Sequence, residues 1–88
     1  MEKLDTIIIL HKNIDRLMFK KIIFKNLKGI EEYIELGIRR FAYIIQGEEE
    51  GFYIEIKWIG NTQDISKLEK WCQIYNGILK YITVKREV

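Results

Sequence analysis

Residues 32–58 read EYIELGIRRFAYIIQGEEEGFYIEIKW and contain the strongest structural signal in the chain. From Phe52 to Trp58, every second residue is large and apolar. This period of two is typical of a β-strand with one buried face. Residues 32–46 alternate in a similar way, and the intervening segment Gly47–Gly51 has the composition of a turn. The stretch therefore predicts a β-hairpin.

In the first strand of this hairpin, the face on which the apolar residues lie changes near the middle. The apolar residues at 34, 36 and 38 would share one face, whereas those at 41, 43 and 45 would share the opposite face. A β-bulge near Arg39 and Arg40 would resolve the conflict, because one extra residue inverts the alternation. The alternative is a strand whose second half is apolar on both faces.

A strand and a helix are expected before the hairpin. Residues 4–10 (LDTIIIL) are mostly β-branched and apolar, as in a central strand. Residues 14–27 predict a helix whose apolar stripe comprises positions 14, 17, 18, 22, 24 and 27. Asn13 or Asp15 can cap its start, and Gly29 follows its end.

A second helix and a last strand are expected after the hairpin. The helix should start with Thr62 or Asp64 as its cap and run to about Tyr75, and residues 78–84 (ILKYITV) should form the strand. The resulting order predicts a single domain over residues 1–88 with the α+β, ferredoxin-like split βαβ fold (β-α-β-β-α-β). Two right-handed crossovers would place both helices on one face of a four-stranded antiparallel sheet, in the order fourth, first, third, second.

Composition narrows the class of protein. Hydrophobic residues make up 48% and charged residues 32% of the chain, which argues against intrinsic disorder. The longest apolar run, residues 7–10, is far shorter than the ~20 residues of a membrane helix. No segment resembles a secretory signal, and Cys72 is the only cysteine. We therefore expect a cytoplasmic protein without a membrane partner.

Catalytic residue types are few. His11 can be an acid–base or metal group, but a surface histidine is the favoured interpretation. Cys72 lies on the apolar stripe of the second predicted helix, where core packing is favoured over reactivity. The run Glu48–Glu50 can hold a divalent ion, but a solvated turn is favoured. We expect no enzymatic activity, no metal, no cofactor and no small-molecule substrate.

Basic and aromatic residues are more informative. Lys21, Lys25 and Lys28 fall on one side of the first predicted helix, for which a solvated face is favoured. On the sheet, alternation places a set of basic and aromatic residues opposite the helices: Arg39, Phe41, Tyr43, Tyr53, Lys57 and Tyr81. Such a patch can stack on bases and pair with phosphates, or it can dock a protein. Composition does not choose between RNA and protein.

The segment ELGIRRFAYII at residues 35–45 resembles the signature of the bacterial small-subunit ribosomal protein six family. That signature has a glycine, a variable residue, two basic or polar residues and then Leu-Ala-Tyr-x-Ile. Residues 6–15 and 78–85 resemble the family's first strand with its helix start and its last strand. This chain departs from the pattern with Phe41 in place of leucine, with Ile44 where many members have proline, and with a first helix about two turns shorter than usual.

The resemblance implies a structural protein of the ribosome that binds small-subunit ribosomal RNA without catalysis. Its implied partner is a small basic protein, small-subunit protein eighteen. The family's basic residues correspond to Arg39, Arg40 and Lys80, which we expect to contact phosphate and sugar. The alternative is a non-ribosomal interaction module of the same fold, which pairs with itself or another chain through its open edge strand.

Overall fold

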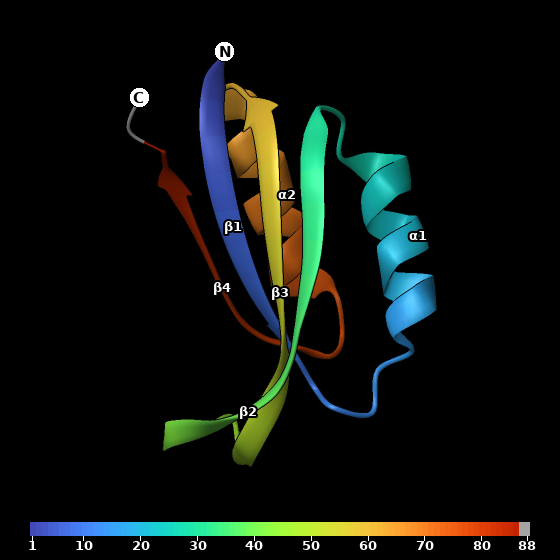
Figure 1. Ribbon diagram of the computed structural model, residues 1–88, viewed down its shortest axis with the longest axis vertical. Helices are drawn as coiled ribbons and strands as arrows, with labels where there is room; N and C mark the ends of the chain where they lie inside the picture. The colour runs from blue at the N-terminus through green and yellow to red at the C-terminus, as the bar shows by residue number, and fades with distance from the viewer. Residues whose placement is uncertain (87–88) are drawn as a thin grey trace.

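A computed structural model describes residues 1–86 of the chain. Its elements follow the order β1 (Glu2–Leu10), α1 (Arg16–Asn26), β2 (Ile30–Ile45), β3 (Glu48–Gly60), α2 (Thr62–Ile74) and β4 (Ile78–Lys85). The four strands form one antiparallel sheet in the order β2-β3-β1-β4 (Figure 1). This arrangement confirms the predicted ferredoxin-like topology, with β2 at an open edge.

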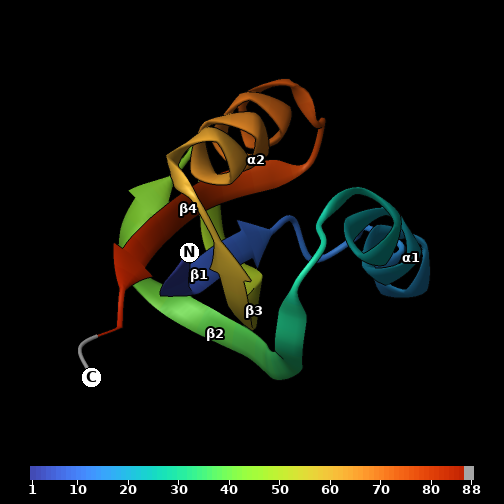
Figure 2. The ribbon, with the colours of Figure 1, turned by 90° about the horizontal axis from the view of Figure 1, so that it is seen from above.

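The core lies between the sheet and the two helices. In the central pair of strands, Leu4 opposes Trp58, and Ile8 opposes Ile54, with all four side chains fully buried. Both helices bury residues against this same face, and together they form one core cluster. Figure 2 shows the two helices splayed apart, with α1 beyond the β2 side of the sheet.

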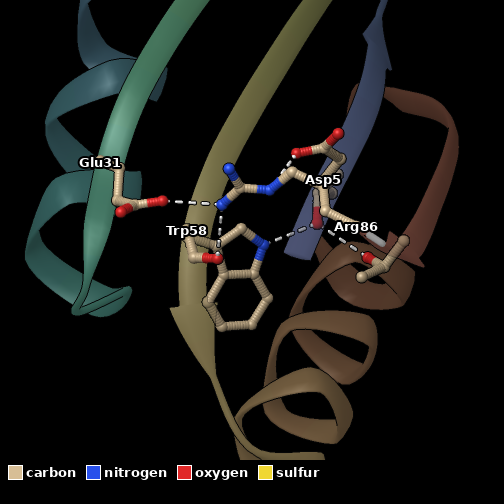
Figure 3. Close-up of polar contacts among 6 residues, drawn as sticks. Asp5, Glu31, Trp58 and Arg86 are labelled. Atoms are coloured by element: carbon tan, nitrogen blue, oxygen red, sulfur yellow. Dashed lines mark hydrogen bonds and ion pairs between the residues drawn. The ribbon is translucent and has the colours of Figure 1, made fainter. Parts of the chain in front are cut away.

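One polar side chain is buried within this core. Thr6 has no solvent exposure, and its hydroxyl oxygen accepts a 2.8 Å hydrogen bond from Trp58 Nε1. The same oxygen lies 2.8 Å from the hydroxyl oxygen of Thr83 (Figure 3). The indole N–H is therefore satisfied in a place that water does not reach, which removes the cost of burying it.

Helix α1 buries a different set of residues from the predicted one. Its buried residues are Phe19 and Ile23, followed by Leu27 at its end, a spacing of four that forms one stripe. The predicted stripe is wrong at Leu17, Met18 and Phe24, which are exposed. The apolar residues of α1 occur around most of its circumference, so periodicity did not single out the buried side.

The ends of both helices are capped by side chains. Asp15, one of the two predicted caps, accepts a 3.1 Å hydrogen bond from the backbone N–H of Met18 through its Oδ1. At α2 the cap is Asn61 instead of the predicted Thr62 or Asp64, and Asn61 and Asp64 form a reciprocal capping box with two 2.9 Å hydrogen bonds. After α1, Gly29 has a φ of 79°, and a Cβ there would come within 2.5 Å of the Ile59 carbonyl oxygen.

The hairpin turn is tighter than predicted. It consists of Gln46 and Gly47, with φ values of 48° and 78°, as in a two-residue turn with both residues left-handed. The acidic run Glu48–Glu50 belongs to β3 instead of the turn. The prediction that Gly47–Gly51 forms the turn is therefore wrong.

β2 has three register shifts, and two of them flank the two arginines. One shift lies between Ile30 and Glu32, another between Glu35 and Gly37, and the third follows Arg40. Arg39 and Arg40 themselves pair regularly with Gly51 and Glu50. The shift between Glu35 and Gly37 inverts the alternation, with Leu36 as the extra residue and Gly37 at a φ of 92°. The prediction of a bulge near Arg39 and Arg40 is therefore wrong: the bulge lies at Leu36, and it places Ile34 and Ile38 on opposite faces instead of the same one.

Candidate nucleic-acid interface

Three side chains form a cluster on the sheet face that points away from the helices. The guanidinium carbon of Arg39 lies 5.7 Å from the centroid of the Tyr53 ring, within the range of a cation–π contact. The Phe41 and Tyr53 ring centroids are 6.1 Å apart. We call Arg39, Phe41 and Tyr53 the Arg39 cluster. It holds an exposed cation against aromatic surface, which is an arrangement suited to stacking and phosphate contact.

The backbone makes room for this cluster at Gly51. Gly51 is the β3 partner of Arg39, and it is buried. A Cβ on this residue would come within 2.8 Å of the Phe41 ring and 2.7 Å of an Ile9 methyl carbon. The missing side chain therefore leaves room for the Phe41 ring over residue 51 of β3, beside Tyr53.

Lys80 shares the same face from the far edge of the sheet. Gly37, Tyr53, Ile9 and Lys80 oppose one another across the four strands. Three strand spacings separate the ends of this row, or about 14 Å. Arg39 lies two residues along β2 from Gly37, so Arg39 and the exposed Lys80 stand about 16 Å apart, on opposite sides of a strip formed by Tyr53 and Ile9. Two cations at this separation can contact different phosphates of one strand.

A register shift in β4 places Lys80 there and removes Tyr81 from this face. Leu10 pairs with Ile78 and Ile9 pairs with Lys80, which leaves Leu79 as an extra residue. Tyr81 therefore opposes buried Ile8, packs against the core and accepts a 3.2 Å hydrogen bond from Gln73 Nε2 through its hydroxyl oxygen. The prediction of Tyr81 in the outer patch is wrong, because the bulge inverts the alternation of β4.

The other predicted residues lie near the cluster without joining it. Lys57 is on the outer face but stands between Asp5 and Glu32 in the register, four residues along β3 from Tyr53, which is about 13 Å. Arg40 follows Arg39 directly in the strand and therefore lies on the opposite face of the sheet, where it forms an exposed 3.7 Å ion pair with Glu49. Tyr43 is 84% exposed near the end of the hairpin. Arg39 and Lys80 are therefore the best-placed cations.

Three polar contacts hold the hairpin end, one to β4 and two to the loop after β1. Gln46 Nε2 donates a 2.7 Å hydrogen bond to the Leu79 carbonyl oxygen. Lys12 pairs with Glu50 at 3.1 Å, and His11 Nε2 lies 3.2 Å from Glu48 Oε1. In Figure 1 this curled end forms the lower part of the molecule. These contacts orient the half of β2 that carries the Arg39 cluster.

Sequence reasoning missed Arg86, which follows β4. Its Nε lies 2.9 Å from Asp5 Oδ1, and its Nη2 donates a 2.7 Å hydrogen bond to Glu31 Oε1 (Figure 3). The guanidinium hydrogen bond holds the pKa of Glu31 below its usual range. Arg86 thereby joins β4, β1 and β2 at one end of the sheet. No local pattern marks this residue, because its partners come from distant segments.

The residue types that can carry catalysis do not converge. His11 Nδ1 accepts a 3.1 Å hydrogen bond from the Asn13 backbone N–H, so its ring is held within the loop after β1. Cys72 is 3% exposed, and burial, followed by the charge of Glu69, raises the pKa of its thiol to about 12. Residues 1–86 contain no group of three or more histidine, cysteine or acidic residues that could hold a metal ion.

One cleft lies between the end of α1 and the start of α2. It has a volume of about 610 Å³, and its lining includes Ile23, Leu68, Trp71 and Asp64. Its lining carboxylate, Asp64, is already used in the capping box of α2. In the described part of the chain, no helix is long and apolar enough to span a membrane.

These features define a small ferredoxin-like α+β domain whose outer sheet face presents an arginine, a lysine and stacked aromatic rings. The sequence model of the family described as Ribosomal protein S6 matches residues 5–85, which is nearly the whole chain. The chain therefore belongs to the ribosomal protein S6 family, a family of structural proteins that are not enzymes.

Individual relatives and a solved structure agree with this assignment. The chain is 38% identical over 52 residues to small ribosomal subunit protein bS6 of Synechococcus elongatus, covering 59% of this chain and 49% of the relative. It is 35% identical over 69 residues to bS6 of Helicobacter hepaticus, covering 78% and 50%. The crystal structure of 30S ribosomal protein S6 from Thermotoga maritima superposes with a TM-score of 0.81 at 27% identity, covering 97% of this chain and 87% of that one. The chain thus spans about half the length of these two sequence relatives.

Proposed function

We propose that this protein is a structural component of the small ribosomal subunit in the cytoplasm and binds small-subunit ribosomal RNA through its outer sheet face. The observation that carries the proposal is the Arg39 cluster, in which Arg39 stacks on Tyr53 and makes no ion pair with a carboxylate among residues 1–86. Arg39 and Lys80 contact phosphate and sugar and set the position of the protein on the RNA. Tyr53 and Phe41 offer rings on which a base or a ribose can pack.

Tight binding requires a partner protein. The net charge is only +2, and two well-placed cations release few counterions, so the isolated chain binds RNA weakly. A small basic protein, small-subunit protein eighteen, supplies further charge and surface beside this face. A coupling free energy of roughly 1–3 kcal/mol makes the pair bind more tightly than either protein alone.

The test is co-sedimentation of tagged protein with small subunits from a bacterial lysate at low and high salt. We expect the protein in the small-subunit fraction at low salt, with an Arg39→Ala and Lys80→Ala double variant released at lower salt than the wild type. A matched control is Lys67→Ala and Lys70→Ala, which removes two exposed lysines of α2 from another part of the surface. Wild-type protein that stays in the ribosome-free fraction at low salt rules out the proposal.

A second candidate function is pairing through the open edge of β2. This sixteen-residue strand ends the sheet, and its Ile38 and Ile44 side chains are exposed. A long apolar edge can add a strand from a second copy or another protein. Light scattering at high micromolar concentration tests self-pairing, and a concentration-independent monomer excludes it.

A further inference from the structure

Helix α1 and its end carry an unbalanced charge. Residues 16–28 contain five basic residues and no acidic one: Arg16, Lys20, Lys21, Lys25 and Lys28. Removing these five from the fifteen basic residues of the chain leaves ten against thirteen acidic residues. The small net positive charge of the protein therefore originates in this one segment, and the remainder is acidic overall.

Two of these side chains share the solvent side of the helix, and a third follows its end. Lys21 and Lys25 are four residues apart and lie in one row on α1, which we call the lysine row, and Lys28 lies beyond the last helical residue, Asn26. Lys21 and Lys25 point away from the buried row of Phe19 and Ile23. All three are exposed, and none forms an ion pair with a carboxylate in the part of the chain that the structure describes.

The other two cations lie toward the sheet. Arg16 is 4.4 Å from the centroid of the Phe52 ring, and Lys20 is 5.4 Å from that of Tyr33. Their positions are thus set by contacts within the fold. Within residues 1–86, Lys21, Lys25 and Lys28 make no such contact, so their charges are available to an external anion.

Exposed apolar side chains border the lysine row. Leu17 is 64% exposed and Phe24 is 48% exposed, and the Phe24 ring lies 5.5 Å from that of Tyr33. We define the basic face of α1 as Lys21, Lys25 and Lys28 with Leu17 and Phe24. A row of ammonium groups beside an aromatic ring matches a sugar–phosphate backbone with an unstacked base.

We propose that the basic face of α1 binds the phosphate backbone of RNA as a second contact, separate from the outer sheet face. The choice of RNA as the anion rests on the proposed function. The helices and the Arg39 cluster lie on opposite faces of the sheet, so the protein bridges two backbone segments. An anionic membrane fits less well, because an interfacial helix needs a broad apolar face, and Phe19 and Ile23 of the eleven-residue α1 are buried in the core, which leaves only Leu17, Met18 and Phe24 exposed as large apolar residues.

The decisive experiment measures how the affinity for purified bacterial small-subunit ribosomal RNA depends on salt. The variant is Lys21→Gln with Lys25→Gln, and the matched control is Lys67→Gln with Lys70→Gln, which removes the same charge from exposed positions of α2. Each lost phosphate contact reduces the slope of log K against log salt by roughly 0.7–0.9. We expect the α1 variant to lose about 1.4–1.8 from this slope and the control to lose less than about 0.5. Circular dichroism verifies that both variants are folded.

The outcomes separate this inference from the proposed function. If the wild type binds the RNA and the α1 variant keeps the wild-type slope, the second contact is wrong and the proposed function stands. If the wild type binds no ribosomal RNA even at low salt, both are wrong. Flotation with phosphatidylglycerol vesicles tests the membrane: if the α1 variant loses vesicle binding while its RNA slope is unchanged, the partner is lipid and the inference is overturned.

Discussion

The ring of Phe41 occupies the space that a side chain on Gly51 would fill. A Cβ on Gly51 would lie 2.8 Å from the Phe41 Cζ and 3.0 Å from the carbonyl oxygen of Leu10. The first neighbour is a side chain that can turn away, but the second is backbone and cannot yield cheaply. The geometry of the Arg39 cluster therefore depends on the absence of a side chain on the neighbouring strand.

Gly51→Ala should displace Phe41 and lower stability by about 1–3 kcal/mol, as overpacking of a closely packed site does. Urea unfolding followed by fluorescence measures the change. Glu49→Ala, at an exposed position of the same strand, is the control and should change stability by less than about 0.5 kcal/mol. A Gly51→Ala variant as stable as the wild type would show that Phe41 does not rest against residue 51.

Thr6→Val should destabilise the protein by about 1–3 kcal/mol, because it leaves the buried Trp58 N–H without an acceptor. Thr83→Val keeps that acceptor, removes only the hydroxyl partner of Thr6 at a half-buried position, and should cost less. The midpoint of urea unfolding provides the comparison. Equal losses in the two variants would mean that the indole bond contributes nothing specific.

Replacing Arg39 should weaken RNA binding more than replacing Arg40. Arg39 stacks on Tyr53 on the outer face, whereas Arg40 lies on the opposite face of the sheet and has an exposed partner in Glu49. Arg39→Ala and Arg40→Ala remove the same charge at adjacent positions, so each serves as the control for the other. Neither should alter the unfolding free energy by more than about 0.5 kcal/mol. Filter binding to ribosomal RNA at fixed salt measures the difference, and equal losses would contradict a contact on the outer face.

The Glu31–Arg86 pair predicts a stability difference that depends on pH. Because the pKa of Glu31 in the folded state lies below its usual value of 4.5, its ionised form is favoured by folding. The contribution of ionised Glu31 to the free energy of unfolding is present above the unfolded-state pKa and is lost as the pH falls through the folded-state pKa. The difference in unfolding free energy between the wild type and Glu31→Gln should therefore shrink as the pH is lowered below about 4.5. Glu32→Gln, at an exposed neighbouring position, should show no such trend.

The Cys72 thiol should be unreactive in the folded protein. Burial raises its pKa to about 12, so almost no thiolate forms at pH 8, and the side chain is 3% exposed. Labelling by a disulfide reagent should be slow in buffer and fast in urea. Replacing exposed Ser66 on the same helix by cysteine, in a Cys72→Ala background, provides a thiol that should label rapidly without urea. Rapid labelling of the folded wild type would contradict the buried position of Cys72.

The element order and the outward position of Arg39, Phe41 and Tyr53 were predictable from the sequence because they rest on short-range periodicity, and the sheet topology followed from the element order and the right-handedness of its crossovers. The alternation from Phe52 to Trp58 identifies the outward face of β3, and Tyr53 lies on it as predicted. The motif around Arg39 likewise identifies the family that the comparison confirms. Amino-acid side chains alternate along any strand, so these inferences need no knowledge of the neighbouring chain.

The remaining features follow from strand pairing and packing. Lys80 and Tyr81 exchange faces because Leu79 is an extra residue opposite β1, and a bulge exists only in relation to a partner strand. Helix α1 has apolar residues on several sides, and only contact with the sheet selects Phe19 and Ile23 for burial. Arg86 pairs with Asp5 and Glu31 because the sheet order brings the end of β4 near β1 and the start of β2. Local sequence thus determined which elements form and which way β3 faces, while long-range register determined which cations share the outer surface.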